Sequence, residues 1–131
     1  MDLSPTDEQR AICEAVRACL EREATPARVR AAEPLGFDPG TWHQLCEMGV
    51  NSMLAPPELG GTGNRLLDVA LVAEEVGRFL APVPLVEHSA ALRLLTHAGA
   101  KDLVGDLVRG EGAATHAPRP AKGGRWLLVP G

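Results

Sequence analysis

The stretch from Leu66 to Leu80 carries apolar residues at nearly every angle around a helix of about 3.6 residues per turn. Within it, Asp68, Glu75 and Arg78 gather in about 80° of arc, and apolar residues cover the far side and also intrude on that arc. This pattern predicts a helix that is covered on more than one side. We therefore expect residues 66–80 to form the central element against which the other helices pack.

Two features near this helix resemble chemical sites, and each has a simpler interpretation. Glu74 and Glu75 are adjacent, but adjacent helix positions point about 100° apart, so we interpret them as solvated or capping charges rather than an acid/base pair. The Pro-Gly-rich segment 56–63 lacks the glycine spacing of a dinucleotide site, the Gly-Lys-Ser/Thr of a phosphate loop, and a preceding strand. We interpret it as a turn into the central helix.

The N-terminal segment predicts an amphipathic helix that ends near Glu23. Ser4 is the expected N-cap, with Pro5 at the first helical position. An apolar stripe faces the core. The opposite side is a ladder of interleaved charges that we expect to be solvated: Arg10, Glu14, Arg17 and Glu21. The following Ala-Arg-rich segment, 25–34, is either one short helix or a loop.

Proline and glycine positions predict the remaining elements. Asp38 caps a helix that stops at Gly49, and the Pro-Val-Pro of 82–84 ends the central helix. Two further helices follow, over residues 85–98 and 101–109. Residues 113–116 and 126–129 have the pattern of two short strands. The predicted fold class is all-α: an orthogonal bundle of about five or six helices with a short C-terminal β-hairpin-like remnant.

One face of the 85–98 helix mixes leucines with side chains that form hydrogen bonds. It spans about 100° and consists of Leu85, His88, Ser89, Leu92 and Thr96. Such a stripe can line a mostly apolar pocket that has a few polar anchors. It can equally be a half-buried face whose polar groups are satisfied within the domain. The pattern leaves both interpretations open.

Composition limits the classes of partner. The chain is 45% hydrophobic but only 3% aromatic, which favours a core of Leu, Val and Ala packed between helices. Its 13 Lys and Arg against 17 Asp and Glu give a net charge of -4, which repels a phosphate backbone. Nucleic acid is therefore not an expected partner.

Cysteine usage and hydropathy indicate a cytoplasmic protein. The three cysteines, Cys13, Cys19 and Cys46, form no C-x-x-C and leave an odd thiol in any pairing, so reduced thiols are expected. We find no N-terminal signal sequence and no apolar run near the roughly 20 residues of a membrane span. His43 and Cys46 lie at i,i+3, but two ligands make no zinc site, so no metal is expected.

A combination of motifs resembles the N-terminal helical domain of acyl-CoA dehydrogenases over about residues 2–112. No single piece is diagnostic, and none is catalytic. The pieces are Trp42-x-x-Leu45-x-x-Met48-Gly49, then Leu54-Ala-Pro-Pro57-Glu58-Leu-Gly60-Gly61-x-Gly63, then Asp68-x-Ala70-x-Val72-x-Glu74-Glu75-x-Gly77-Arg78, with the Ala81-Pro-Val-Pro84 exit.

The resemblance implies a flavoprotein oxidoreductase of lipid metabolism that forms an α,β double bond in an acyl-CoA and passes a hydride to FAD. In such enzymes a middle β-domain and a C-terminal four-helix domain hold most flavin contacts and the catalytic base. The implied domains here are an N-terminal α-domain, 1–112, and the truncated start of the β-domain, 113–131. No catalytic residue is expected, flavin-binding residues are not identified, and this chain alone is expected to bind no FAD.

In this family the helix after the Pro-x-Pro exit forms part of the acyl-pocket wall, which implies that role for Leu85, His88, Ser89 and Leu92. The resemblance also implies subunit contacts in a homo- or hetero-oligomer of dehydrogenase-like chains, with acyl-CoA as the substrate of the complete enzyme. Two alternatives are a non-catalytic helical partner subunit that completes a heteromeric dehydrogenase, and a free-standing acyl carrier built around His88 and Ser89.

Overall fold

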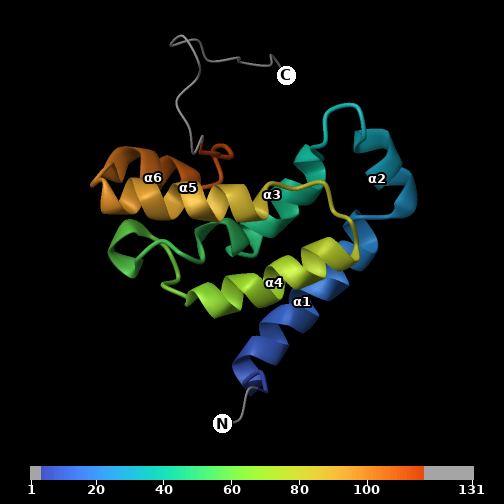
Figure 1. Ribbon diagram of the computed structural model, residues 1–131, viewed down its shortest axis with the longest axis horizontal. Coiled ribbons are helices and arrows are strands. Elements are labelled where there is room, and N and C mark those ends of the chain that lie inside the picture. The colour runs from blue at the N-terminus through green and yellow to red at the C-terminus, as the bar shows by residue number, and fades with distance from the viewer. Residues whose placement is uncertain (1–3, 117–131) are drawn as a thin grey trace.

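The computed structural model describes residues 4–116, which form a bundle of α-helices joined by short loops (Figure 1). The predicted all-α class is confirmed, and residues 4–116 contain no strand, so residues 113–116 do not form the first strand of the predicted hairpin. Residues 126–129, the second strand of the predicted hairpin, lie outside the described residues. The elements are α1 (Asp7–Glu23), α2 (Pro26–Ala32), α3 (Pro39–Glu47), the 3-10 turns η1 (Val50–Ser52) and η2 (Pro57–Leu59), α4 (Leu66–Arg78), α5 (Leu85–His97) and α6 (Lys101–Val108).

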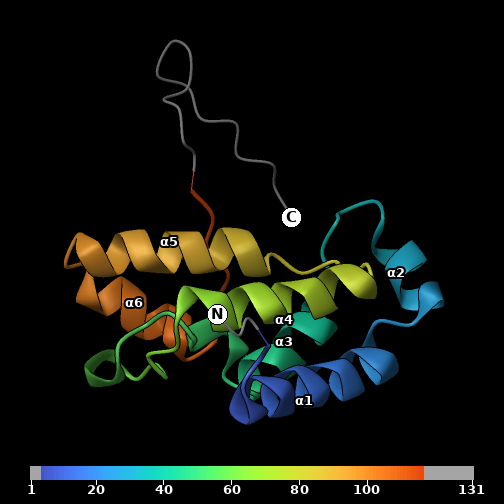
Figure 2. The same cartoon turned by 60° about the horizontal axis from the view of Figure 1, so that its bottom comes forward.

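The helices pack in two connected groups. α1 lies against α4 and α3, while α5 packs on α6 and η1. Figure 2 shows α5, α4 and α1 one below the other, with α2 at one end. None of the helices between residues 4 and 116 is long and apolar enough to span a membrane. The larger core cluster includes Leu20, Leu45 and Leu85, and the smaller one joins Ala55, Leu92 and Val104.

The first helix starts later than the sequence predicts. Thr6 is the N-cap: its hydroxyl accepts from the Gln9 N–H at 3.2 Å, and the Gln9 side-chain oxygen accepts from the Thr6 N–H at 2.9 Å. This capping box satisfies two backbone donors reciprocally, which a start at Ser4 and Pro5 cannot do. The prediction of Ser4 as the cap is wrong because it overlooked the Thr-x-x-Gln spacing.

Asp38 and Gly49 lie where the sequence predicts a cap and a helix stop, and Thr25 forms a further cap. Thr25 caps α2, so the segment that the sequence left open is a helix. Asp38 caps α3 by accepting from the Gly40 N–H at 3.0 Å. Beyond α3, Gly49 has a φ of 77°, a left-handed conformation that suits glycine.

α4 packs against α1 and also meets α5, as the predicted cover on more than one side requires, but part of its apolar surface stays exposed in the described part of the molecule. Leu66 and Leu67 at its start are 61% and 58% exposed, and Leu80 just beyond its end is 75% exposed. The polar arc is the one turned toward α1, where Asp68 accepts from the Gln9 side-chain amide at 2.7 Å. Apolar residues around a helix show which of its sides can be buried. They do not show how many other helices are present to cover those sides.

Glu75 is a buried carboxylate, with its side chain only 5% exposed. Arg17 of α1 donates to both of its oxygens, from Nε at 3.0 Å and from Nη2 at 2.7 Å, and Arg78 lies 3.3 Å away. The Arg17 hydrogen bonds hold the pKa of Glu75 below its usual range, although burial opposes this. The solvated interpretation is thus confirmed for the exposed Glu74 and wrong for Glu75 and for its half-buried partner Arg17.

Leu80 adopts a backbone conformation that usually requires glycine. Its φ is 51°, and it ends α4 in a Schellman-type turn in which the Ala81 N–H donates to the Val76 carbonyl at 3.0 Å. A Cβ in this region costs roughly 1–2 kcal/mol. We expect Leu80→Gly to raise the free energy of unfolding by about 1 kcal/mol, measured by urea denaturation.

Leu80→Ala is the matched control, because it removes the exposed side chain but keeps the Cβ in its strained position. It should give little or none of the gain. Equal stabilisation by both variants would show that the exposed apolar side chain, and not the backbone conformation, limits stability.

Candidate functional site

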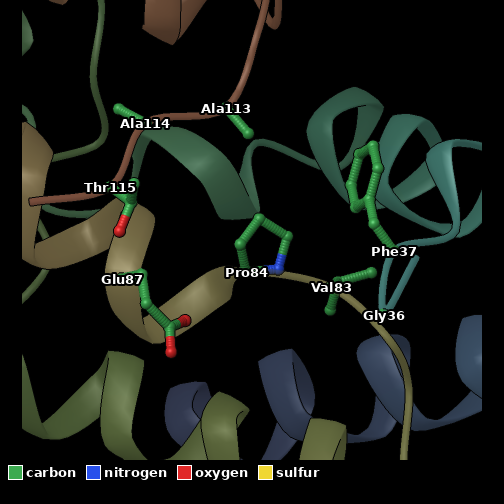
Figure 3. A pocket seen from close by; sticks show the side chains of 8 residues that line it. All are labelled: Gly36, Phe37, Val83, Pro84, Glu87, Ala113, Ala114 and Thr115. Atoms are coloured by element: carbon green, nitrogen blue, oxygen red, sulfur yellow. The ribbon is translucent and has the colours of Figure 1, made fainter. Parts of the chain in front are cut away.

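A cavity of about 380 Å³ lies where the start of α5 meets residues 113–115. This volume falls within the range of small-molecule sites, about 300–1,000 Å³. Figure 3 shows Phe37 and Val83 on one side of it, and Glu87 and Thr115 on the other. Three segments far apart in sequence therefore converge on one hollow. Its lining residues are Gly36, Phe37, Val83, Pro84, Glu87, Ala113, Ala114 and Thr115.

Capping interactions of α3 help to fix the shape of this cavity. The Asp38 N–H donates to the Pro82 carbonyl at 2.8 Å, which ties the loop carrying Phe37 to the Pro-x-Pro exit. Arg28 bridges Asp38 at 3.0 Å and Glu23 at 2.5 Å. Burial raises the pKa of Asp38, but hydrogen bonds led by that of Thr41 outweigh it and lower the pKa overall. The cap is therefore a well-held carboxylate.

The cavity combines an apolar side with two oxygen-bearing side chains. Phe37, Val83 and Pro84 supply the apolar surface, and the Glu87 carboxylate and Thr115 hydroxyl supply the polar one. Such a surface suits an apolar ligand that also carries a hydrogen-bonding group.

The four residues predicted from the α5 stripe lie behind the cavity, in the core. Leu85 and Leu92 are 1% and 0% exposed, and His88 and Ser89 are 0% and 5% exposed. The structure brings these four together on the inner face of α5, but none of them lines the cavity. Pro84 and Glu87, at the start of α5, line the cavity instead. In the sequence, Pro84 is marked by the Pro-x-Pro exit and Glu87 by its charge on the outer face of the helix.

His88 forms hydrogen bonds at both ring nitrogens. Nδ1 accepts from the backbone N–H of Ala114 at 3.1 Å, so it carries no proton, and Nε2–H then donates to the Asn51 carbonyl at 3.1 Å. The ring also meets Trp42 edge to face, with 4.9 Å between centroids. His88 is thus a neutral imidazole of defined tautomer, held on three sides.

Burial lowers the pKa of His88 below its ordinary value of 6.5, although the hydrogen bond to Asn51 opposes this. Between the lowered pKa and 6.5, the unfolded chain binds a proton that the folded chain excludes. Stability should therefore fall as pH drops from about 6.5 toward the lowered pKa, and should level off below it. Urea denaturation over a pH series measures this slope.

His88→Asn is the control for the pH dependence, because an amide does not titrate in this range. The variant should lose the slope that His88 contributes. The same pH dependence in both proteins would contradict the assignment. Asp68 and Glu75, whose pKa values are lowered by hydrogen bonds, contribute to the pH dependence of both proteins, so the comparison of the two removes their effect.

Comparison with known proteins agrees with this arrangement of helices. The family model for the acyl-CoA dehydrogenase N-terminal domain matches residues 6–107. This chain belongs to the acyl-CoA dehydrogenase family. As an acyl-CoA dehydrogenase N-terminal domain, it has the all-α architecture of that family, and one wall of its cavity is formed by residues that follow α6.

Two curated acyl-CoA dehydrogenases illustrate the relationship. Acyl-CoA dehydrogenase IpdE2 of Mycolicibacterium smegmatis is 38% identical over 108 residues, which are 80% of this chain and 35% of that protein. The cyclohex-1-ene-1-carbonyl-CoA dehydrogenase of Syntrophus aciditrophicus is 34% identical over 93 residues, 71% of this chain and 21% of that protein. The chain therefore spans about a third or less of the length of these relatives.

A solved structure shows the same fold. It is a variant of the Tcur3481-Tcur3483 steroid ACAD, and it matches with a TM-score of 0.76 and 29% sequence identity. The match covers 83% of this chain and 32% of that chain. The helical bundle is thus the acyl-CoA dehydrogenase N-terminal domain in structure as well as in sequence.

Acyl-CoA dehydrogenases use FAD, but the cavity described here does not fit it. Among its lining residues, Glu87 is the one charged side chain, and a carboxylate does not attract the pyrophosphate of a flavin dinucleotide. The Gly-rich turn offers no cradle either, because Gly61 packs against the Ala55 carbonyl. Across residues 4–116, no group of three or more His, Cys, Asp or Glu side chains is arranged to hold a metal.

Proposed function

We propose that this chain is the N-terminal domain of an FAD-dependent acyl-CoA dehydrogenase and that it supplies one wall of the acyl pocket. The observation that carries the proposal is the cavity between the start of α5 and residues 113–115, in a domain of this family. Pro84 and Glu87 present the wall directly. Leu85, His88, Ser89 and Leu92 support it from the core.

The acyl group that suits this wall is a ring-bearing one with a polar substituent. Phe37, Val83 and Pro84 offer a broad apolar surface, and Glu87 and Thr115 accept hydrogen bonds beside it. The names of related proteins support this class, since one is a cyclohex-1-ene-1-carbonyl-CoA dehydrogenase and another a steroid ACAD. The wall would select the acyl end of the thioester and leave the reacting carbons to groups outside the described residues.

The exposed leucines of the bundle support a second role, in contacts with other parts of a complete enzyme. Leu66 and Leu67 on α4, Leu94 on α5 and Leu103 on α6 are each more than half exposed. Apolar side chains at this exposure gain stability when another surface covers them. We place these residues at domain or subunit contacts of a homo- or hetero-oligomer.

Dehydrogenation by this chain alone is not expected. Catalysis requires a flavin and a carboxylate base held together at the reacting carbons, and the described residues offer neither arrangement. The flavin chemistry would be completed by groups outside residues 4–116. Three free cysteines, at 13, 19 and 46, are consistent with work in the reducing cytoplasm.

A heteromeric enzyme is a second candidate, in which this chain is a non-catalytic partner subunit. The name of the matched structure joins two designations, Tcur3481 and Tcur3483, which supports a two-component arrangement. In this case the flavin and base belong to a different polypeptide. The two candidate functions predict that different proteins will co-purify with this chain from its native host.

The experiment is purification of the tagged chain from its native host with whatever remains bound. We expect flavin absorbance and acyl-CoA-dependent dye reduction only in a preparation that also contains other dehydrogenase domains, identified by mass spectrometry. A separate flavin-bearing chain supports the partner subunit. Flavin and activity in the pure 131-residue chain would overturn the proposal that it is inactive alone.

The wall is tested in the active preparation with two thioesters of equal carbon number, cyclohexanecarbonyl-CoA and heptanoyl-CoA. Val83→Trp fills the cavity, and we expect it to raise KM for the ring thioester about tenfold or more. Val86→Trp is the matched control, because Val86 lies three residues further along the chain, at the start of α5, is 60% exposed, and does not line the cavity. If both variants raised KM for the ring thioester equally, or if neither variant raised it, the proposal that these residues form a wall of the acyl pocket would be rejected.

A further inference from the structure

Residues 113–115 form one wall of the cavity, and a single side chain ties them to the helical bundle. The Ala114 N–H donates to Nδ1 of His88 at 3.1 Å. Within residues 4–116, this is the one hydrogen bond that joins this wall to the helices. The position of the wall therefore depends on the orientation of one imidazole ring.

The other nitrogen of the His88 ring, Nε2, connects to the 3-10 turn η1. Nε2–H donates to the Asn51 carbonyl at 3.1 Å. The Asn51 side-chain amide donates in turn to the carbonyls of Leu107 at 2.7 Å and Val108 at 3.1 Å, at the end of α6. A buried polar chain thus runs from α6 through η1 and α5 to the wall.

We propose that His88 is a positioning residue, which holds the Ala114 backbone so that residues 113–115 close the cavity beside Pro84 and Glu87. The inference rests on the proposed function in one respect, which is that the ligand of the cavity is an acyl thioester. The contact itself is a property of this chain.

An imidazole suits this position because it has an acceptor and a donor on opposite sides of a rigid ring. A leucine here would leave the buried Asn51 carbonyl and the half-buried Ala114 N–H without these partners, which is unfavourable. Trp42 packs edge to face on the ring at an interplanar angle of 66°, which restricts its rotation. The ring is therefore held in the orientation that fixes Ala114.

Two amide variants separate positioning from simple core packing. His88→Asn keeps an acceptor near the Nδ1 position and loses the donor to Asn51. His88→Gln keeps a donor near the Nε2 position and loses the acceptor for Ala114. Each variant loses one of the two hydrogen bonds, so general destabilisation should affect both to a similar extent.

The measurement is backbone amide hydrogen exchange by nuclear magnetic resonance on the full chain. We expect the Ala114 amide to exchange about tenfold faster in His88→Gln than in His88→Asn, the factor that loss of one hydrogen bond of about 1.4 kcal/mol gives. The Val104 amide, which donates to the carbonyl of the α6 N-cap residue Ala100, serves as the reference for opening of the bundle. It should not distinguish the two variants.

Equal Ala114 exchange in the two variants, after correction by Val104, would overturn the positioning role. In the active preparation, His88→Gln should also raise KM for cyclohexanecarbonyl-CoA more than His88→Asn does. A difference in exchange with no thioester recognition by any preparation would support positioning and reject the proposed function. The two failures are therefore distinguishable.

Discussion

Replacement of Leu92 by alanine is expected to lower the free energy of unfolding by about 2–5 kcal/mol. Leu92 is fully buried, and it packs with Ala55 and Val104 where α5 meets α6 and the chain beyond η1. Removing its branched side chain removes the transfer free energy and leaves a cavity in a small cluster that has little room to collapse. Urea or thermal denaturation of the full chain measures the loss.

Leu94→Ala is the matched control for this prediction. Leu94 lies on the same helix but is 53% exposed, so its loss should change stability by no more than about 0.5 kcal/mol. If both variants were equally mild, Leu92 would not be a core residue. In that case its predicted place in the acyl-pocket wall would have to be considered as a direct contact.

The second large effect is expected for Gly61→Ala. A Cβ on Gly61 would lie 2.1 Å from the Ala55 carbonyl oxygen and 2.4 Å from its carbon, both of them backbone atoms. The turn would have to move away from a buried residue, at a cost of about 1–3 kcal/mol or more. We expect a lower midpoint in urea with an unchanged slope, since the whole fold is destabilised.

Gly112→Ala serves as the control for Gly61, because nothing lies within 4 Å of its added Cβ. Its effect should remain within about 0.5 kcal/mol. A Gly61→Ala protein as stable as the Gly112→Ala protein would show that the turn does not pack closely on Ala55. The result would also reopen the phosphate-binding interpretation of the Gly-rich segment.

Local signals made most of the helical architecture predictable from sequence. Asp38 and Pro39 start a helix by satisfying or avoiding orphan N–H groups, and this requires no knowledge of distant residues. The proline exit before Leu85 works in the same way. The miss at the first helix was also local, since Thr6 and Gln9 formed a stronger cap than the Ser-Pro start that was chosen.

The errors arose where a residue depends on a distant partner. Glu75 and Arg17 lie 58 positions apart, and each alone has the pattern of an exposed helical charge. Only the crossing of α1 and α4 shows that they meet, with Glu75 buried and Arg17 half-buried. The exposure of Leu66 has the same cause, because helical periodicity describes a surface and not what covers it.

The sequence predicted the helix that borders the candidate site, but it did not predict which residues line the cavity. The stripe that includes His88 and Ser89 lies on the buried face of α5. A polar group among leucines has the same sequence pattern whether it meets a ligand or a backbone amide. Residues 113–116 carried only the pattern of a short strand, which the structure does not form, and nothing in that pattern marked a cavity wall. Their role depends on the spatial convergence of three segments.

The bond between His88 and Ala114 bears on where this domain can be cut for separate expression. A gene fragment that stops after residue 112, at the boundary suggested by the motif pattern, would remove the donor and leave a buried ring nitrogen facing no partner. A fragment extended through Thr115 retains that donor. We therefore expect a fragment that ends at Thr115 to be more stable than one that ends at residue 112.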